Sequence, residues 1–391
     1  MGTAVFLFEA KPPLFHFKTL PPAPSLANPP PKKSRMASVF AFVSNRGGVG
    51  KSTLVSQLAP VVAAANPSKT VLVIDLSIQG DTSVNLLGGV QAPAQFNPGV
   101  RTLGDEKMLT IDSQSSALGL INALSATMGQ APTRSFWRGG FMASSTATTI
   151  TPIDYAVSVK DKHPAGKAPS NLYISYGGPN LYGQQINPVS GAADKLRAGF
   201  AKMDNCIVLI DTDAELSERP TSLLGIAVAQ KIILVLSPHW ADYSRLLQDP
   251  ANGIFLALAF LKQNDSGFKG KIAGFLFNNV SKRLNDGTNL CGVPALPFTP
   301  PNDEVAGMTE ISSHMFQMAI DMNSMLSDYF LNWSATTAGD FVRTYVSAIG
   351  SIPTTVIQPA LAQGIAVINM PTTPPQAASR AQFEAVAAKC F

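Results

Sequence analysis

Short, almost continuous apolar runs alternate along the chain with longer segments in which apolar residues recur every three or four positions. Runs of this kind, rich in Val, Ile and Leu, predict parallel strands buried on both faces, and the longer segments predict helices. Strands are expected at residues 37–43, 70–75, 206–213, 231–238 and 272–280, and at 171–178, where the last residues form a small-residue turn. Helices are expected at residues 53–65, 192–202, 253–262, 303–335 and 377–389. This alternation predicts an α/β fold, with a mostly parallel sheet and helices on both of its faces.

The composition allows a large buried core but gives few charges to the surface. Of the 391 residues, 46% are hydrophobic and 14% are charged, which suits one elaborated domain or two. No apolar run is long enough to cross a bilayer. The net charge of +4 is compatible with weak binding to DNA or to an acidic membrane surface and requires neither. Cys206, Cys291 and Cys390 lack disulfide or metal spacing, which favours a reducing compartment, here expected to be the cytoplasm.

The first 35 residues differ from the rest of the chain. They contain eight prolines, five basic residues and one acid, Glu9. This composition predicts a flexible, basic, proline-rich tail. Two alternatives stay open: a targeting peptide that directs the chain to an organelle, and an upstream start with Met36 as the working one.

A glycine-rich loop joins the first expected strand to the first expected helix. The segment 44–53 reads SNRGGVGKST. Glycines allow backbone N–H groups to point at a polyanion, the lysine reaches the outer phosphates, and the following hydroxyl can ligate Mg²⁺. The loop therefore predicts a nucleoside triphosphate as its ligand. The residues expected to bind it are Gly47, Gly48, Val49, Gly50, Lys51, Ser52 and Thr53.

The loop resembles the deviant Walker A motif, the phosphate loop of the ParA/MinD ATPases, and the ParA family is the most similar. The signature position before the two glycines is usually lysine in that family, and here it is Arg46. The resemblance implies a P-loop NTPase fold, ATP and Mg²⁺ as cofactors, and an ATP-bound homodimer in which this residue crosses to the phosphates of the partner. Arginine keeps the charge and adds a planar fork suited to phosphate.

Acids at the ends of two expected strands complete the predicted site. Asp75 and Asp211 end buried runs, and with Ser52 they are the expected Mg²⁺ ligands, Asp211 as a Walker B aspartate. Lys51, Asp75 and Arg46 are the residues expected to act in catalysis. The resemblance places a second aspartate, which orients the attacking water, where this chain has Ser77, so slow ATP hydrolysis is expected.

The resemblance extends to the region that binds the base. Asn278 is the candidate to read the adenine edge, with Asn279 second, and Pro353 resembles the proline that lines the base pocket. Compared with the family, one domain at residues 36–391 is expected, with insertions at about 91–170 and 290–350. The first insertion is either a functional addition or an idle solvated excursion. In the second, the apolar face of the expected long helix packs on the core or forms a Met-rich surface for a partner or for self-association.

Three functions follow from these observations. The first is a partitioning or positioning ATPase that binds a surface such as non-specific DNA as an ATP dimer and releases it when an unknown activating or cargo-adaptor protein stimulates hydrolysis. The second is a nucleotide-dependent scaffold or filament with little turnover, and the third is an ATP-dependent ligase. Candidate DNA contacts are Lys271, Lys282, Arg283 and Arg343, although each also fits a solvated surface.

Overall fold

The computed structural model describes residues 36–91, 102–128, 150–163, 167–184, 186–214, 220–248, 253–280, 302–321, 327–370 and 373–391. Among these residues, eight strands form one sheet in the order β3-β4-β2-β5-β1-β6-β7-β8. All neighbours are parallel except β3 and β4. The strands are β1 (Ser38–Val43), β2 (Thr70–Asp75), β3 (Val157–Ser158), β4 (Leu172–Ser175), β5 (Cys206–Asp211), β6 (Lys231–Leu236), β7 (Lys271–Val280) and β8 (Val346–Gly350). The expected α/β architecture is confirmed.

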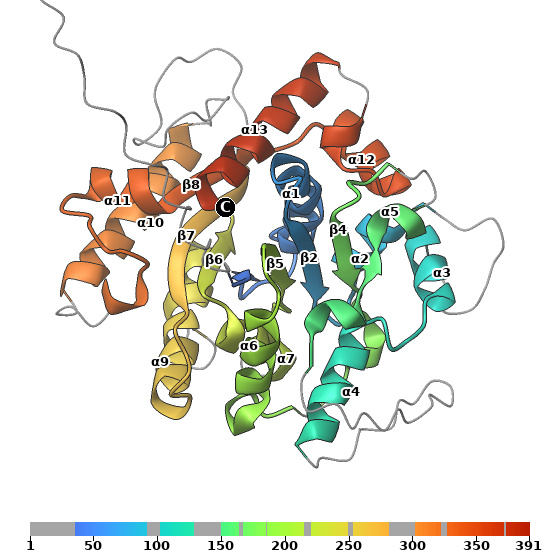
Figure 1. Ribbon diagram of the computed structural model, residues 1–391. Coiled ribbons are helices and arrows are strands. Elements are labelled where there is room, and N and C mark those ends of the chain that lie inside the picture. Colours follow the sequence, from blue (N-terminus) through green and yellow to red (C-terminus); the bar gives the residue numbers. More distant parts are fainter. Residues whose placement is uncertain are drawn as a thin grey trace, which may run out of the picture. The chain divides into compact units, whose positions relative to one another are not determined.

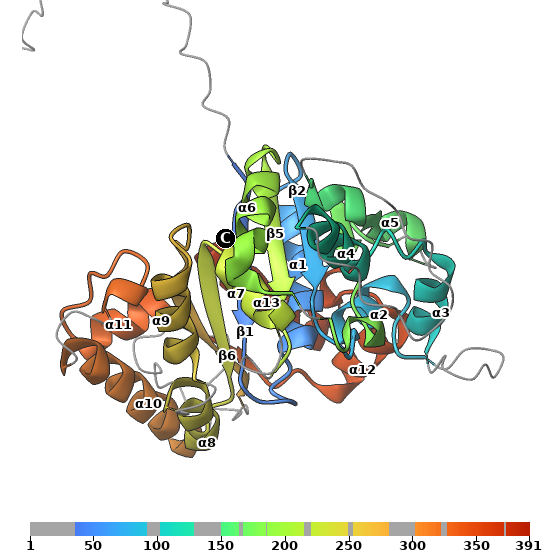
Figure 2. The same cartoon turned by 90° about the horizontal axis from the view of Figure 1, so that it is seen from below.

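Helices cover both faces of the sheet, as Figures 1 and 2 show. One face packs against α1 (Lys51–Ala65), α2 (Asp81–Leu87), α5 (Val159–Lys162), α12 (Thr354–Gln363) and α13 (Pro374–Cys390), with α3 (Leu103–Thr110) against α2. The other face packs against α4 (Ala117–Thr127), α6 (Ala193–Ala201), α7 (Pro220–Val228), α8 (Trp240–Tyr243), α9 (Ile254–Asn264), α10 (Asn302–Asp321) and α11 (Ala338–Tyr345). Because side chains alternate along each strand, Phe40 and Phe42 join the first core while Ala41 and Val43 join the second.

The described part of residues 91–170 belongs to the packed body of the protein. In α4, Leu120, Ile121 and Leu124 are buried against the sheet, and β3 pairs with β4 at the edge of the sheet. The side chain of Ser116 caps α4 by accepting a hydrogen bond from the backbone of Gly119. The buried residues of α4 and the pairing of β3 therefore make part of this region core, so its described residues are not a wholly solvated excursion.

The region 290–350 differs from the expectation in two ways. Residues 346–350 form β8, a buried strand of the central sheet, and so belong to the core fold. The expected helix over 303–335 is wrong in length, because α10 ends at Asp321. Residues 327–329 form a separate short turn of helix, after which the backbone of Leu331 donates to Ile272 in β7.

Beyond α10, a cluster of aromatic rings packs against Phe275 of β7. Phe330, Trp333, Phe341 and Tyr345 contact one another with centroids 5.2–6.0 Å apart, and Phe341 also contacts Phe275 at 5.8 Å. Phe330 and Trp333 belong to this cluster and lie in non-helical backbone, so their apolar spacing does not come from a helix.

The apolar face of α10 itself is core. Met308 and Met315 are each 2% exposed, and Ile311 is fully buried. This burial favours the packing interpretation of the methionines over a surface for a partner. Residues 35–391 form one compact unit. The tail at 1–35, Cys291, Lys282 and Arg283 lie outside the described residues, where no feature expected of them is tested. Within the described residues, no helix combines the length and the apolar character needed to span a membrane.

A candidate phosphate-binding site at the carboxyl edge of the sheet

The candidate site lies where the carboxyl ends of β1, β2 and β5 meet. Asp75 at the end of β2 lies directly opposite Asp211 at the end of β5, and Phe42 of β1 lies on the other side of Asp211. The glycine loop leaves β1 at this edge and enters α1 at Lys51. Parallel sheets bind ligands at this edge, since the loops there separate. The fold thus brings the two predicted acids and the phosphate loop together.

The loop turns sharply into α1 at Gly50. This residue has φ 78°, in the left-handed region, and its carbonyl accepts the first hydrogen bond of the helix from Leu54. A Cβ there would lie 2.5 Å from the side-chain nitrogen of Asn278. Glycine is therefore required both for the backbone conformation and for the close approach of β7.

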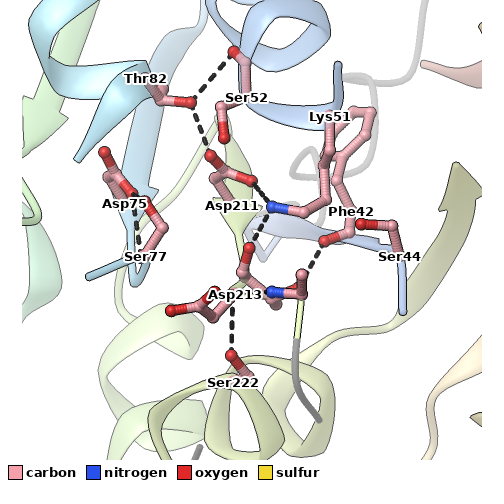
Figure 3. Close-up of polar contacts among 12 residues, drawn as sticks. Phe42, Ser44, Lys51, Ser52, Asp75, Ser77, Thr82, Asp211, Asp213 and Ser222 are labelled. Carbon is pink, nitrogen blue, oxygen red and sulfur yellow. Dashed lines mark hydrogen bonds and ion pairs between the residues drawn. The ribbon is translucent and has the colours of Figure 1, made fainter. Parts of the chain in front are cut away.

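Lys51 points into the protein and is paired with the end of β5. Its side chain is 7% exposed, and its ammonium donates to the carboxylate of Asp211 and to the backbone carbonyl of Thr212 (Figure 3). The other carboxylate oxygen of Asp211 accepts from the hydroxyl of Thr82 at 2.6 Å. The same hydroxyl lies 3.1 Å from the carbonyl of Ser52. The buried charges of lysine and aspartate are thus compensated within the site.

Asp75 is fully buried and fully hydrogen-bonded. One oxygen accepts from the backbone and hydroxyl of Ser77 at 3.0 and 2.6 Å, and the other accepts from the backbone and hydroxyl of Ser83 at the same distances. Burial and the charge of Asp211 raise the pKa of Asp75 to about 6, although the serine hydrogen bonds oppose this. Ser77 therefore donates hydrogen bonds to Asp75. Because position 77 is a serine, it supplies no carboxylate of its own.

A glycine of the neighbouring strand closes the other side of Asp75. A Cβ on Gly177, just after β4, would lie 2.4 Å from the backbone oxygen of Asp75 and 2.9 Å from its carboxyl group. The backbone of Gly177 also donates to the hydroxyl of Ser83 at 2.9 Å. The small-residue turn predicted at the end of the strand at 171–178 is therefore what allows this packing.

The oxygen atoms at this edge suit a magnesium ion. Among the described residues, no group of three or more His, Cys, Asp or Glu side chains could hold a metal ion by itself. Mg²⁺ is usually bound by one or two protein oxygens together with phosphates and water. Ser52 and Asp211 fit that pattern. Asp75 lies beside Asp211, but both of its carboxylate oxygens are engaged by four hydrogen bonds. It could therefore contact Mg²⁺ only through a water molecule, or after some of these hydrogen bonds break.

Arg46 lies on the outer side of the loop and is paired within its own chain. Its guanidinium donates to Asp242 of α8, whose side chain is 3% exposed, whereas that of Arg46 is 46% exposed. The hydrogen bond and charge of Asp242 raise the pKa of Arg46. Next to it, the side-chain amide of Asn45 donates to the carbonyl of Arg245 at 2.8 Å. Two contacts therefore tie the loop to the segment that follows β6.

The residues expected to bind the base lie near the carboxyl ends of β7 and β8. The amide of Asn278 in β7 donates to the carbonyl of Val49 in the phosphate loop at 2.7 Å, so in this structure it supports the loop. Asn279 is exposed, with φ 59°. Pro353 directly precedes α12, and the backbone of Ser351 donates to Val280. The structure therefore places Asn278 and Pro353 on neighbouring strand ends.

Several functional contacts could not be found by searching for charged residues. Thr82 and Ser83 bind the two buried acids, yet neither belongs to the motifs from which the site was predicted. The only signal is their place in the first turn of α2, where hydroxyl residues often bond to nearby groups. Asp242 comes shortly after Ser237 and Pro238, which directly follow β6. Nothing in this local sequence indicates that Asp242 pairs with Arg46.

The sequence of residues 40–308 matches the family described as the CobQ/CobB/MinD/ParA nucleotide binding domain. The chain belongs to this family. The resemblance to the ParA/MinD ATPases is thereby confirmed, and the phosphate loop, α1 and the ends of β2 and β5 lie within the matched residues. A comparison with curated protein sequences finds no significant match.

Solved structures of other proteins share the fold. McdA from Cyanothece, as a variant in complex with ATP, is 15% identical, with 90% of this chain and 96% of that chain covered and a TM-score of 0.51. Apo McdA is 16% identical, with 90% and 99% covered and a TM-score of 0.50. The pNOB8 ParA structure with nonspecific DNA is 15% identical, with 91% and 96% covered and a TM-score of 0.47. At these identities the likeness to the two McdA structures shows the fold alone.

Proposed function

We propose that this family member is an ATP-dependent dimerising switch of the ParA type, which positions DNA or another cargo and hydrolyses ATP slowly. The observation that carries the proposal is the arrangement of the phosphate loop. Lys51 faces inward toward Asp211, whereas Arg46, Gly47 and Gly48 are exposed on the outer side. A Cβ on either glycine would meet no atom within 4 Å, so a second subunit has room to approach the loop.

The residues of the chain divide the work of binding ATP. The loop amides and the N-terminus of α1 attract the phosphates, and Lys51 neutralises their outer charge. Ser52 and Asp211 would hold Mg²⁺, which neutralises charge that develops during phosphoryl transfer. Asn278 and Pro353 would contact the base. Arg46 would leave Asp242 and reach the phosphates bound to the partner.

Slow hydrolysis is inferred from Ser77 and Asp75. Phosphoryl transfer to water needs a group that positions the water. Ser77 has no carboxylate, and the carboxylate of Asp75 is engaged by four hydrogen bonds. A slow basal rate would keep the ATP dimer long-lived until an activating protein binds. We place the switch in the cytoplasm, with a targeting role of residues 1–35 as the alternative.

The test separates binding from dimerisation. Lys51→Ala should lose nucleotide binding, whereas Arg46→Ala should bind ATP with unchanged affinity and stay monomeric in size-exclusion chromatography with ATP and Mg²⁺. Arg380→Ala is the matched control, since this arginine is also 46% exposed and ion-paired, but on α13. Thermal unfolding without nucleotide checks that each variant is folded.

Two outcomes would count against the proposal. A wild-type protein that stays monomeric in saturating ATP and Mg²⁺ would contradict the dimeric switch. An Arg46→Ala variant that dimerises as readily as Arg380→Ala would show that the signature residue has no role in assembly.

The surface that the dimer binds needs a separate measurement. Retention on non-specific DNA with ATP, ADP and a slowly hydrolysed analogue, at two salt concentrations, distinguishes the candidates. Binding in the ATP state that weakens steeply with salt supports DNA as the surface. Lys271 and Arg343 are the described candidate contacts. Filaments, or ATP binding without turnover, would instead support the scaffold.

One cavity among the described residues is a candidate for the substrate pocket of a ligase. A ligase needs a second substrate pocket beside the outer phosphate. The cavity formed by Val61, Ala65, Arg380 and Phe391 lies between the end of α1 and α13. Lys51 begins the same helix, about 15 Å away at 1.5 Å per residue. This cavity therefore lies too far from the phosphate loop to hold a substrate that reacts there.

A further inference from the structure

The two buried acids of the site have little capacity left to orient a water molecule. A carboxylate offers about four lone-pair positions. Asp75 uses four of them for Ser77 and Ser83. Asp211 accepts from Lys51 and Thr82, and it is also an expected metal ligand. A water-orienting group must therefore come from elsewhere at this edge.

Asp213 is a carboxylate that the sequence pattern does not assign. It follows Thr212, whose carbonyl accepts from the ammonium of Lys51, so its backbone lies next to the cation that contacts the outer phosphates. One carboxylate oxygen accepts from the backbone of Ile78 at 3.3 Å. Because Ile78 follows Ser77 in the chain, this carboxylate lies beside the position where the family has its second aspartate. Figure 3 shows Asp213 and Ser77 on the same side of Lys51.

Hydrogen bonds from neighbouring residues fix the orientation of Asp213 without using all the lone pairs of its carboxylate. Its backbone N–H donates to the hydroxyl of Ser222 in α7 at 2.8 Å. Its second carboxylate oxygen accepts from the backbone of Ala214 at 2.7 Å. One hydrogen bond to each oxygen leaves further lone pairs, and Asp213 is partly exposed, unlike Asp75. A held but incompletely bonded acid suits the positioning of a water molecule.

We infer that Asp213 supplies the carboxylate that Ser77 lacks, and that it orients the water that attacks the γ-phosphate. This inference rests on the proposed ATPase function. The water oxygen forms the new bond to phosphorus, and the bond from phosphorus to the bridging oxygen breaks with its electron pair going to ADP. One proton of the water stays on the released phosphate, and the other passes through Asp213 to solvent.

Asp81 is the competing acid at this edge. It is the first residue of α2 and is exposed. Desolvation of its carboxyl group by neighbouring atoms and the charges of Asp211 and Asp213 raise its pKa, although the side chain keeps much of its contact with solvent, and the charge of Lys51 opposes this shift, so Asp81 lies within electrostatic reach of the site. It adjoins Thr82, however, which bonds to the carbonyl of Ser52, and so lies toward the expected metal ligands. Asp81→Asn therefore tests the competing acid beside Asp213→Asn.

The experiment compares nucleotide affinity with turnover in the full-length protein. Affinity is measured with a fluorescent ATP analogue and Mg²⁺, and single-turnover hydrolysis is measured with ATP. Asp213→Asn should lower the rate about 100-fold, the size expected for loss of an acid–base group, with affinity within about twofold of wild type. Asp213→Glu should recover part of the rate because it restores the carboxylate. Asp81→Asn should lower the rate less than Asp213→Asn does, and Asp154→Asn, at an exposed acid in the helical turn Pro152–Tyr155, should stay close to wild type.

The outcomes separate this inference from the proposed function. If the wild type does not bind ATP, the proposed function fails. If it hydrolyses ATP and Asp213→Asn retains that rate, or if Asp81→Asn causes the large loss instead, only the role of Asp213 is overturned. Binding without any wild-type turnover also overturns it. A rate for Asp213→Glu no higher than for Asp213→Asn would show that the loss does not come from the missing carboxylate.

Discussion

At the scale of single residues, Ser77 has a structural role that its type alone does not show. Its hydroxyl donates to the buried Asp75 at 2.6 Å, and its backbone donates to the same oxygen at 3.0 Å. Ser77, at the position where the resemblance expects an aspartate, thus helps to stabilise the buried Asp75, because a buried carboxylate needs hydrogen-bond donors. The substitution changes both the chemistry and the packing at this edge.

Ser77→Ala is therefore expected to lower the stability of the protein without nucleotide. Removing one donor from a buried carboxylate costs about 1–3 kcal/mol in the free energy of unfolding. Urea unfolding at neutral pH measures this change. Ser113→Ala, at an exposed serine, is the control and should be close to neutral. Equal stabilities for the two variants would contradict the role given to Ser77.

Residue-scale prediction from the sequence worked where chemistry is tied to position along a strand. Lys51 and Asp211 could be expected to meet, since a loop and a strand end at the same edge of a parallel sheet converge, and the structure brings them together. The partners of the acids could not be predicted. Thr82 and Ser83 reach them only through the way α2 docks, which depends on tertiary packing that no local pattern encodes.

At the scale of elements, a buried histidine links the edge of the sheet to α12. His163 directly follows α5, and its ring nitrogen lies 2.8 Å from the carbonyl of Gly364 at the end of α12. Burial lowers the pKa of His163 below its usual 6.5, although hydrogen bonds to the backbone of Gly364 and Gln363 oppose this. The folded protein therefore prefers the neutral ring.

This preference makes stability depend on pH in a defined direction. As pH falls below 6.5 the unfolded chain binds the proton first, so the contribution of His163 is complete above that pH and is lost as pH decreases. Thermal unfolding of the wild type and of His163→Gln at about pH 7.5 and 5.5 should show a steeper loss in the wild type, by up to about 1 kcal/mol. Parallel losses in the two proteins would argue against this assignment.

Elements with long apolar runs were predictable, and short or interrupted ones were not. β1, β2, β5, β6 and β7 follow their expected positions, since each is buried on both faces and reads as a continuous apolar run. β8 was missed because its five residues follow α11 without a break. The expected end of the helix at 303–335 was wrong because the spacing of apolar residues continues past Asp321, whereas Phe330 and Trp333 serve an aromatic cluster from non-helical backbone.

At the scale of the whole molecule, the pair between Arg46 and Asp242 competes with assembly. In the proposed dimer Arg46 must leave Asp242 before it can reach the partner's phosphates. Asp242 is also bonded to the backbone and hydroxyl of Ser237 at the end of β6, so it is held in place whether or not Arg46 is present. Each subunit would thus keep Arg46 occupied until the proposed dimer forms.

Asp242→Asn should therefore favour the dimer. Asparagine keeps the shape of the side chain and weakens the attachment of Arg46, so dimerisation in ATP and Mg²⁺ should occur at a roughly threefold lower protein concentration, in line with the small energy of a partly exposed ion pair. Analytical ultracentrifugation measures this midpoint. The control is Asp340→Asn, which removes the ion pair with Arg343 in α11. A midpoint that rises, or that shifts equally in the control, would refute the competition.

The pairing of Lys51 with Asp211 and with the carbonyl of Thr212 also sets how nucleotide and metal binding are related. An arriving phosphate must take the lysine from a carboxylate that is 0% exposed, and that carboxylate is then left without its cation. A divalent ion is the natural replacement, because an isolated buried charge is costly. Nucleotide and metal should consequently bind cooperatively, each strengthening the other. Without metal, the binding free energy of the nucleotide would equal the gain from its contacts with the loop and Lys51 minus the loss of the contacts of Lys51 with Asp211 and Thr212. The affinity for nucleotide alone should therefore be weaker than the number of donors in the loop would suggest.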